Sequence, residues 1–116
     1  MAGAQQDVGA PTSEAREARG VDVLAELADF YKVFGDPTRL RILRELMARE
    51  LCVHEIAQAV GMQQSAVSHQ LRILKQAYLV RSRRVGKEAH YSLSDSHVRA
   101  VFEQGLVHVG EGREKP

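Results

Sequence analysis

The sequence predicts a small domain that is mainly α-helical with one β-hairpin, in the order helix, helix, helix, helix, hairpin, helix. Apolar residues recur at steps of three and four over most of the chain, which is typical of amphipathic helices. From Tyr78 the period changes, and the stretch "YLVRSRRVGKEAHYSL" has the β-branched, aromatic and basic residues of two short strands around a turn. The 116 residues, 44% of them hydrophobic, fit a single core. We expect this core at residues 21–111, between a disordered arm at 1–20 and a tail at 112–116.

The composition excludes two classes of protein. No apolar run approaches the ~20 residues needed to cross a membrane. The small, polar first twenty residues lack the basic start and apolar stretch of a secretory signal. Cys52 is the only cysteine, so no intramolecular disulfide can form. We therefore expect a cytoplasmic protein with no membrane partner.

The first two helices are predicted from periodicity and capping residues. Apolar residues at helical spacing predict a helix from Val21 to about Phe34. In "GDPTRLRILRELMARE", Asp36 can cap a second helix, and Pro37 suits its first position. The buried stripe predicted for this helix consists of Leu40, Leu43, Leu46 and Met47.

The next two helices form a helix-turn-helix pattern. A short helix is expected at about Val53–Val60, ended by Gly61, which is a good C-terminal cap residue. The helix that follows, in "MQQSAVSHQLRILKQAYLV", has one apolar and one polar side. In this arrangement the second helix enters the major groove of DNA. The spacing alone is a weak signal, because many helix pairs in small domains share it.

A hairpin and a final helix complete the chain. The turn of the hairpin is predicted at Val85-Gly86-Lys87. The final helix is predicted to begin near Asp95 or Ser96, and to run to about Val109 before Gly110.

Positive charge is concentrated in one segment. Residues 63–90 hold six basic side chains and one acidic one, whereas residues 1–30 hold two basic and six acidic ones. This pattern is expected of a phosphate-contacting surface, although a solvated helix face and turn would look the same. With the polar helix side it favours double-stranded DNA as a partner, and Gln64 can bond an adenine edge bidentately. The predicted DNA-binding residues are Gln64, Ser65, Ser68, His69, Arg72, Arg83, Arg84 and Lys87.

From about Val23 to Glu111 the chain resembles the ArsR/SmtB family of winged-helix, metal-sensing repressors. The most specific stretches are "ELCVHEIA" and "SAVSHQLRILKQAYLV". The resemblance implies a winged helix-turn-helix homodimer, paired through its first and last helices, that is not an enzyme. Gln63 departs from the family, whose members usually have Ser or Thr as the cap of the DNA-reading helix. The resemblance places Gln64, Ser65, Ser68 and His69 on that helix, and Arg83, Arg84 and Lys87 in the wing.

Four potential metal ligands lie in two pairs on the last helix: Asp95 with His97, and His108 with Glu111. The pairs are ~16 Å apart along a helix axis, whereas zinc–ligand bonds are ~2 Å, so one helix cannot close a site from both. Two antiparallel copies across a two-fold axis can bring the first pair of one chain to the second pair of the other. The spacing equally allows that Asp95 is only a cap and the histidines are incidental. The resemblance favours the metal site, because all four positions match the ligand pattern of the family's C-terminal-helix zinc and cobalt sensors.

Two imidazoles and two carboxylates suit Zn(II) best, with Ni(II) or Co(II) as alternatives. Ions that favour thiolates, such as Cu(I), Cd(II) and As(III), fit poorly. The family's other site, near Cys52, normally has a second cysteine where this chain has His54. Cys52 is therefore expected to be a small, buried residue at a helix start.

The predicted function is that of a metal-responsive transcriptional regulator. The metal-free dimer is expected to bind a palindromic operator, and metal to weaken this binding and derepress metal-homeostasis genes. One alternative is a nickel- or cobalt-responsive regulator of the same fold, acting with a partner protein or as an activator. Others are a DNA-binding protein that ignores metal and a small metalloenzyme. The last is disfavoured, because no base or oxyanion donor completes a reaction.

Overall fold

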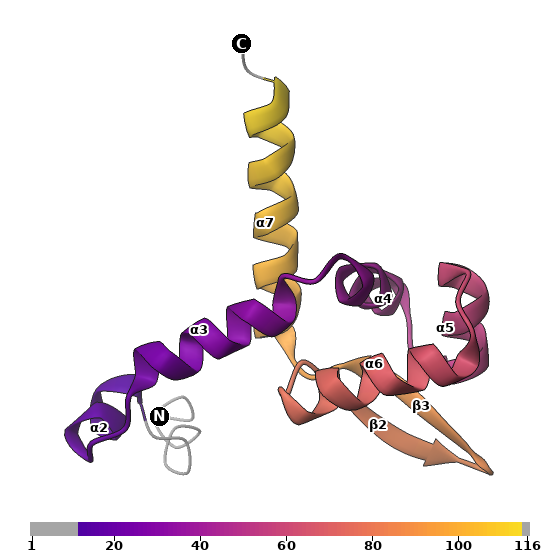
Figure 1. Ribbon diagram of the computed structural model, residues 1–116, viewed down its shortest axis with the longest axis horizontal. Helices are drawn as coiled ribbons and strands as arrows, with labels where there is room; N and C mark the ends of the chain where they lie inside the picture. The colour runs from indigo at the N-terminus through magenta and orange to yellow at the C-terminus, as the bar shows by residue number, and fades with distance from the viewer. Residues whose placement is uncertain (1–11, 115–116) are drawn as a thin grey trace, which may run out of the picture. The chain divides into compact units, whose positions relative to one another are not determined.

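The computed structural model describes residues 12–114, with the side chains of residues 12–111. The chain divides into two compact units, Met1–Lys32 and Val33–Pro116. Within the described part, no helix is long and apolar enough to cross a membrane. The elements (Figure 1) are α2 (Ser13–Ala18), α3 (Val23–Phe34), α4 (Pro37–Ala48), β1 (Leu51–Cys52), α5 (Val53–Val60), α6 (Gln64–Gln76), β2 (Val80–Val85), β3 (Glu88–Leu93) and α7 (Ser96–Glu114).

The first unit contains a helix where the sequence predicted a disordered arm. The Thr12 hydroxyl caps α2 by accepting a hydrogen bond of 3.0 Å from the Ala15 amide. Arg16 forms an ion pair of 2.9 Å with Glu26 of α3. The prediction of disorder was thus wrong for Ser13–Ala18, and its residues 1–11 lie outside the described part of the chain.

Helices α4, α5 and α6 have the bounds that their caps predict. The Asp36 carboxylate accepts from the Arg39 amide at 3.1 Å, with Pro37 in the first helical position. Helix α5 ends at Gly61, whose φ of 71° is the left-handed conformation that glycine adopts readily. Gln63 occupies the cap position of α6 without a side-chain cap hydrogen bond, as its departure from the family pattern implies.

Helix α6 ends through a hydrogen-bond pattern that places a tyrosine in a strained conformation. The Leu79 amide donates to the Leu74 carbonyl at 2.9 Å, and the Tyr78 amide donates to the Lys75 carbonyl at 3.0 Å. These two bonds form a Schellman motif, in which the residue at the Tyr78 position is left-handed and most often glycine. Tyr78 has a φ of 62° and is the sole non-glycine residue of positive φ in the described part.

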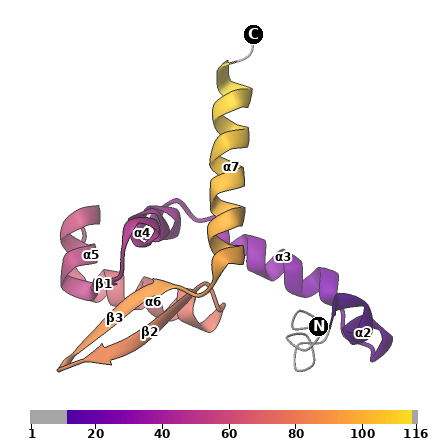
Figure 2. The same cartoon turned by 180° about the vertical axis from the view of Figure 1, so that it is seen from behind.

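The hairpin belongs to a three-stranded antiparallel sheet of order β1-β3-β2. The two-residue strand β1 was not predicted, because two residues cannot display a period. The hairpin turns at Gly86, whose φ of 64° is the positive value that a two-residue turn requires. Figure 2 shows the hairpin with its tip pointing away from α7.

Helix α7 continues to Glu114, so the predicted end before Gly110 was wrong. Gly110 is not among the glycines of positive φ, and a glycine that keeps helical φ costs a helix only ~1 kcal/mol. The core of the second unit lies among α4, α5, α6, the sheet and the first turns of α7. Its completely buried side chains are Ile42, Leu43, Ile56, Val67, Leu71, Leu74 and Leu79.

Candidate DNA-binding surface and metal-ligand pairs

Helix α6 presents a polar face to solvent and an apolar face to the core. Gln64, Ser65, His69 and Arg72 are exposed, and Ser68 is half-buried. The opposite face buries Val67, Leu71 and Leu74, which fixes the rotation of the helix about its own axis. All five DNA-binding candidates on α6 therefore lie on its accessible side.

The first turn of α6 contacts the first turn of α5 through His54, a residue that was not predicted to belong to the DNA-binding surface. The Gln64 side-chain nitrogen and the His54 Nδ1 are 3.1 Å apart, and both side chains are exposed. The sequence pointed to His54 only as a fragment of a metal site. The tight turn at Gly61 is the signal that could have placed the two first turns side by side.

The hairpin contacts α6 through one face. Lys75 donates from its Nζ to the Ser82 hydroxyl at 2.8 Å. Since side chains alternate along a strand, Arg84 lies on the Ser82 face of β2, and Arg83 lies on the opposite face. Arg84 and Lys87 are exposed.

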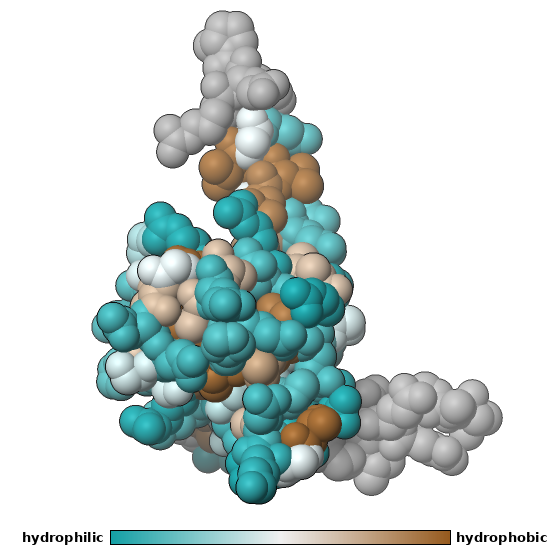
Figure 3. Space-filling model, turned by 90° about the vertical axis from the view of Figure 1, so that its right-hand side faces the viewer, coloured by the Kyte–Doolittle hydropathy of each residue, from teal (hydrophilic) through white to brown (hydrophobic). Residues whose placement is uncertain are grey.

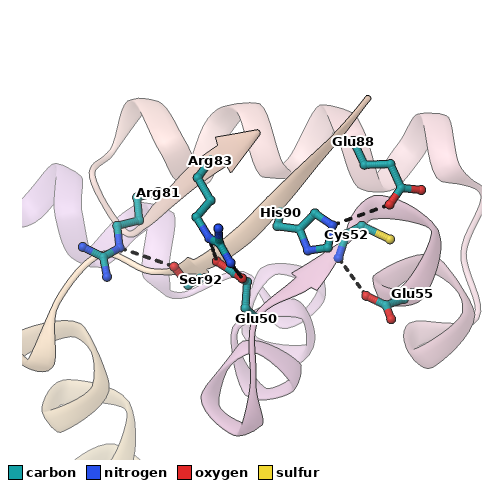
Figure 4. Close-up of polar contacts among 8 residues, drawn as sticks. All are labelled: Glu50, Cys52, Glu55, Arg81, Arg83, Glu88, His90 and Ser92. Carbon is teal, nitrogen blue, oxygen red and sulfur yellow. Dashed lines mark hydrogen bonds and ion pairs between the residues drawn. The ribbon is translucent and has the colours of Figure 1, made fainter. Parts of the chain in front are cut away.

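Arg83 is held by an acidic partner that was not predicted. Its Nε and Nη2 donate to the two carboxylate oxygens of Glu50 at 2.8 and 2.7 Å, a bidentate pair (Figure 4). This hydrogen bonding lowers the pKa of Glu50 and raises that of Arg83. The structure thus gives Arg83 a role in attaching the hairpin to the segment before β1, on the face that Arg81 shares. Of the predicted wing residues, Arg84 and Lys87 have no such partner among the hydrogen bonds and ion pairs of the described residues.

Cys52 and its neighbours contact other residues of the protein. Cys52 is 7% exposed, as predicted for a small structural residue. The Glu55 carboxylate accepts from the Cys52 backbone amide at 3.0 Å, which lowers the pKa of Glu55. His54 lies beside Gln64, and His90 forms a 3.5 Å contact with Glu88 (Figure 4).

The two predicted metal-ligand pairs lie on α7 and are accessible. Asp95 caps the helix by accepting from the Val98 amide at 3.1 Å, and the same oxygen lies 3.6 Å from His97 Nδ1. The side chain of His97 is 91% exposed, and His108 and Glu111 are exposed further along the helix. Within a single chain, the described residues contain no group of three or more His, Cys, Asp or Glu able to hold a metal.

Apolar side chains are exposed on α3 and on the second half of α7. On α7 they are Leu106, Val107 and Val109, each at least half exposed, and Figure 3 shows apolar surface gathered near the end of this helix. On α3 they are Leu24, Leu27 and Tyr31. Runs of exposed apolar residues on a small domain mark interaction surfaces.

Known proteins resemble this chain in sequence and in fold. Residues 36–82 match the family model described as bacterial regulatory protein, arsR family. A transcriptional repressor SmtB homolog of Synechocystis is 42% identical over 95 residues, which span 82% of this chain and 72% of the relative. The chain belongs to the ArsR family. The HTH-type transcriptional regulator NmtR of Mycobacterium tuberculosis is 42% identical over 84 residues, covering 72% of this chain and 70% of that one.

Solved structures of ArsR-family proteins have the same fold. A homodimeric winged helix-turn-helix DNA-binding domain from Mycobacterium bovis superposes with a TM-score of 0.77 at 30% identity, covering 90% of this chain and 93% of that domain. Apo-NmtR gives a TM-score of 0.69 at 36% identity, covering 88% of this chain and 80% of that one. The predicted winged helix-turn-helix is therefore confirmed, with α5 and α6 as its helix pair and the β2–β3 hairpin as its wing. ArsR-family proteins are DNA-binding transcriptional regulators and not enzymes.

Proposed function

We propose that this chain is a homodimeric, metal-responsive transcriptional repressor that binds a palindromic operator when metal-free. The observation that carries the proposal is the pair of accessible ligand sets at the two ends of α7, Asp95 with His97 and His108 with Glu111. Each pair alone offers two donors, fewer than the four of a closed tetrahedral site. A site completed by the partner subunit's His108 and Glu111 reaches four, and symmetry makes two sites per dimer.

Exposed apolar surface supports the dimer. Leu106, Val107 and Val109 are exposed on the second half of α7, where a second copy could cover them. Their burial would favour association, since apolar area removed from water contributes roughly 25 cal/mol per Å². The resemblance to a homodimeric domain adds to this argument.

The donor chemistry supports Zn(II) as the ion sensed, with Co(II) or Ni(II) as alternatives. Relatives include a cadmium resistance regulatory protein CadC homolog of Staphylococcus aureus and an antimony-specific repressor AntR. Soft ions such as these favour thiolates, whereas this chain has one cysteine, which is buried. Bound between two α7 helices, the ion would supply a cross-link that fixes their relative position.

The DNA contacts proposed for the metal-free dimer come from α6 and the hairpin. Gln64, Ser65, Ser68 and His69 are proposed to read base edges, and Arg72, Arg84 and Lys87 to contact phosphates. Arg83 is proposed to reach a phosphate only by leaving Glu50. Because metal is proposed to weaken operator binding, linkage requires the operator to weaken metal binding by the same factor.

Operator binding with and without Zn(II) tests the proposal. An operator would be selected from random duplex DNA with the metal-free protein, and its Kd measured by fluorescence anisotropy. Zn(II) should raise the Kd of the wild type by ten-fold or more, within the ~5–150-fold range usual for allosteric coupling. His97→Ala should keep the metal-free Kd and lose the response, whereas Glu103→Gln, at an exposed carboxylate elsewhere on α7, should keep both. The measurement would be repeated with Co(II) and Ni(II), and a wild-type Kd that none of the three ions changes would rule out metal sensing.

A further inference from the structure

Arg39 connects α6, the proposed reading helix, to the end of α3. It lies in the first turn of α4 and is half-buried. Its Nε donates to the Gln70 side-chain oxygen on α6 at 3.0 Å, and its Nη1 donates to the Val33 backbone carbonyl at 3.0 Å. One guanidinium group thus contacts positions 31 residues and six residues away in the chain.

The geometry of these two bonds restricts movement between the helices. A guanidinium is planar and presents its N–H groups in a fixed fork, so two acceptors bound to one group hold a defined separation. Gln70 is half-buried, on the side of α6 that is turned toward the protein. Shifting α6 relative to Val33 would break at least one bond and leave a part-buried polar group unpaired, which is unfavourable.

The same end of α3 contacts the helix that carries the metal-ligand pairs. Phe34, next to Val33, packs edge-to-face on Phe102 of α7, with ring centroids 6.2 Å apart and an interplanar angle of 62°. Both rings are buried, at 8% and 5% exposure. Phe102 lies between His97 and His108 along α7, so the helix segment between the two ligand pairs rests on the residue adjoining the Arg39 acceptor.

We propose that Arg39 is a positioning residue that transmits a change in α7 to the reading helix, through Phe102, Phe34, the Val33 carbonyl and Gln70. This inference rests on the proposed function and adds to it a route inside one protomer. Arg39 contacts neither the ligand pairs nor the exposed face of α6. Its removal therefore uncouples two binding events that both persist.

The test is the coupling factor, which is the operator Kd with Zn(II) divided by the Kd without it. It would be measured for the wild-type dimer, Arg39→Met, Gln70→Met and the double variant. Methionine keeps much of the side-chain volume and removes the hydrogen bonds. Gln70→Glu retains an acceptor for Arg39 and serves as the rescue variant. Arg41→Met, at an exposed arginine of the same helix, is the matched control for loss of positive charge.

Each single variant should lower the coupling factor at least about fivefold, and the double variant should lower it no further, because both remove the same connection. Gln70→Glu and Arg41→Met should keep the wild-type factor. Zn(II) affinity without DNA should stay within about twofold, which also shows that the variants fold. If the operator Kd with Zn(II) and the Kd without it rise together, the coupling factor stays unchanged and Arg39 has only a structural role. That result would overturn this inference and leave the proposed function intact. A wild-type coupling factor of one would overturn the proposed function and the inference with it.

Discussion

Replacing Tyr78 with glycine should stabilise the protein, although it removes an aromatic side chain. Tyr78 occupies the left-handed position of the Schellman motif that ends α6, with a φ of 62°. A residue with a Cβ pays roughly 1–2 kcal/mol for this conformation, and glycine does not. Glycine costs roughly 0.5–1 kcal/mol through the greater freedom of the unfolded chain. The tyrosine is 82% exposed, so its loss gives up little buried surface. The midpoints of these two ranges differ by about 0.75 kcal/mol, which is the net gain expected for Tyr78→Gly.

The measurement is urea unfolding of metal-free wild type and variant at equal protein concentration, because the stability of a dimer depends on concentration. Gln76→Gly is the matched control. This exposed residue is helical, so glycine there should cost up to about 1 kcal/mol. A Tyr78→Gly variant no more stable than the wild type would refute the strain argument and assign the side chain a stabilising contact.

Three further predictions follow from the structure. Glu50 has a lowered pKa, so its stabilising effect is present above the unfolded value of about 4.3 and is lost as pH falls through the lower folded value. Acid titration of Glu50→Gln should therefore show a smaller loss of stability over that pH range than the wild type. Leu106→Glu places a charge in the proposed dimer surface and should shift the sedimentation of the metal-free protein toward the monomer, and an unshifted dimer would place the interface elsewhere. Cys52→Ser should leave the Zn(II)-induced change in operator Kd within about twofold, and loss of the response would move the metal site to β1.

Where a local signal exists, the sequence predicted the structure closely. Asp36 with Pro37 marks the start of α4, and Gly61 marks the end of α5, because both caps act within one turn. Helix α2 was missed because it has no apolar stripe and depends on the Thr12 cap and the Arg16–Glu26 pair. Gly110 was misread as a stop, since glycine ends a helix only when it leaves helical φ.

The candidate site was predictable only as a set of residue types. The exposed side of α6 follows from helical periodicity, and the spacing of the ligand pairs on α7 follows from the rise of a helix. The Arg83–Glu50 and Arg39–Gln70 contacts join residues 33 and 31 positions apart. Such pairs depend on how the elements pack and leave no local pattern, so the roles proposed for Arg83 and Arg39 could come only from the structure.

Each metal site is proposed to be shared between two subunits, and mixing two variants that do not bind metal tests this sharing most directly. His97→Ala and His108→Ala should each fail to bind Zn(II) tightly as pure dimers. In a mixed dimer, one site loses both histidines and the other keeps all four ligands. Random subunit exchange makes half of the dimers mixed, so an equimolar mixture should recover about a quarter of the wild-type zinc stoichiometry. No recovery on mixing, or tight binding by either variant alone, would contradict a site built from both subunits.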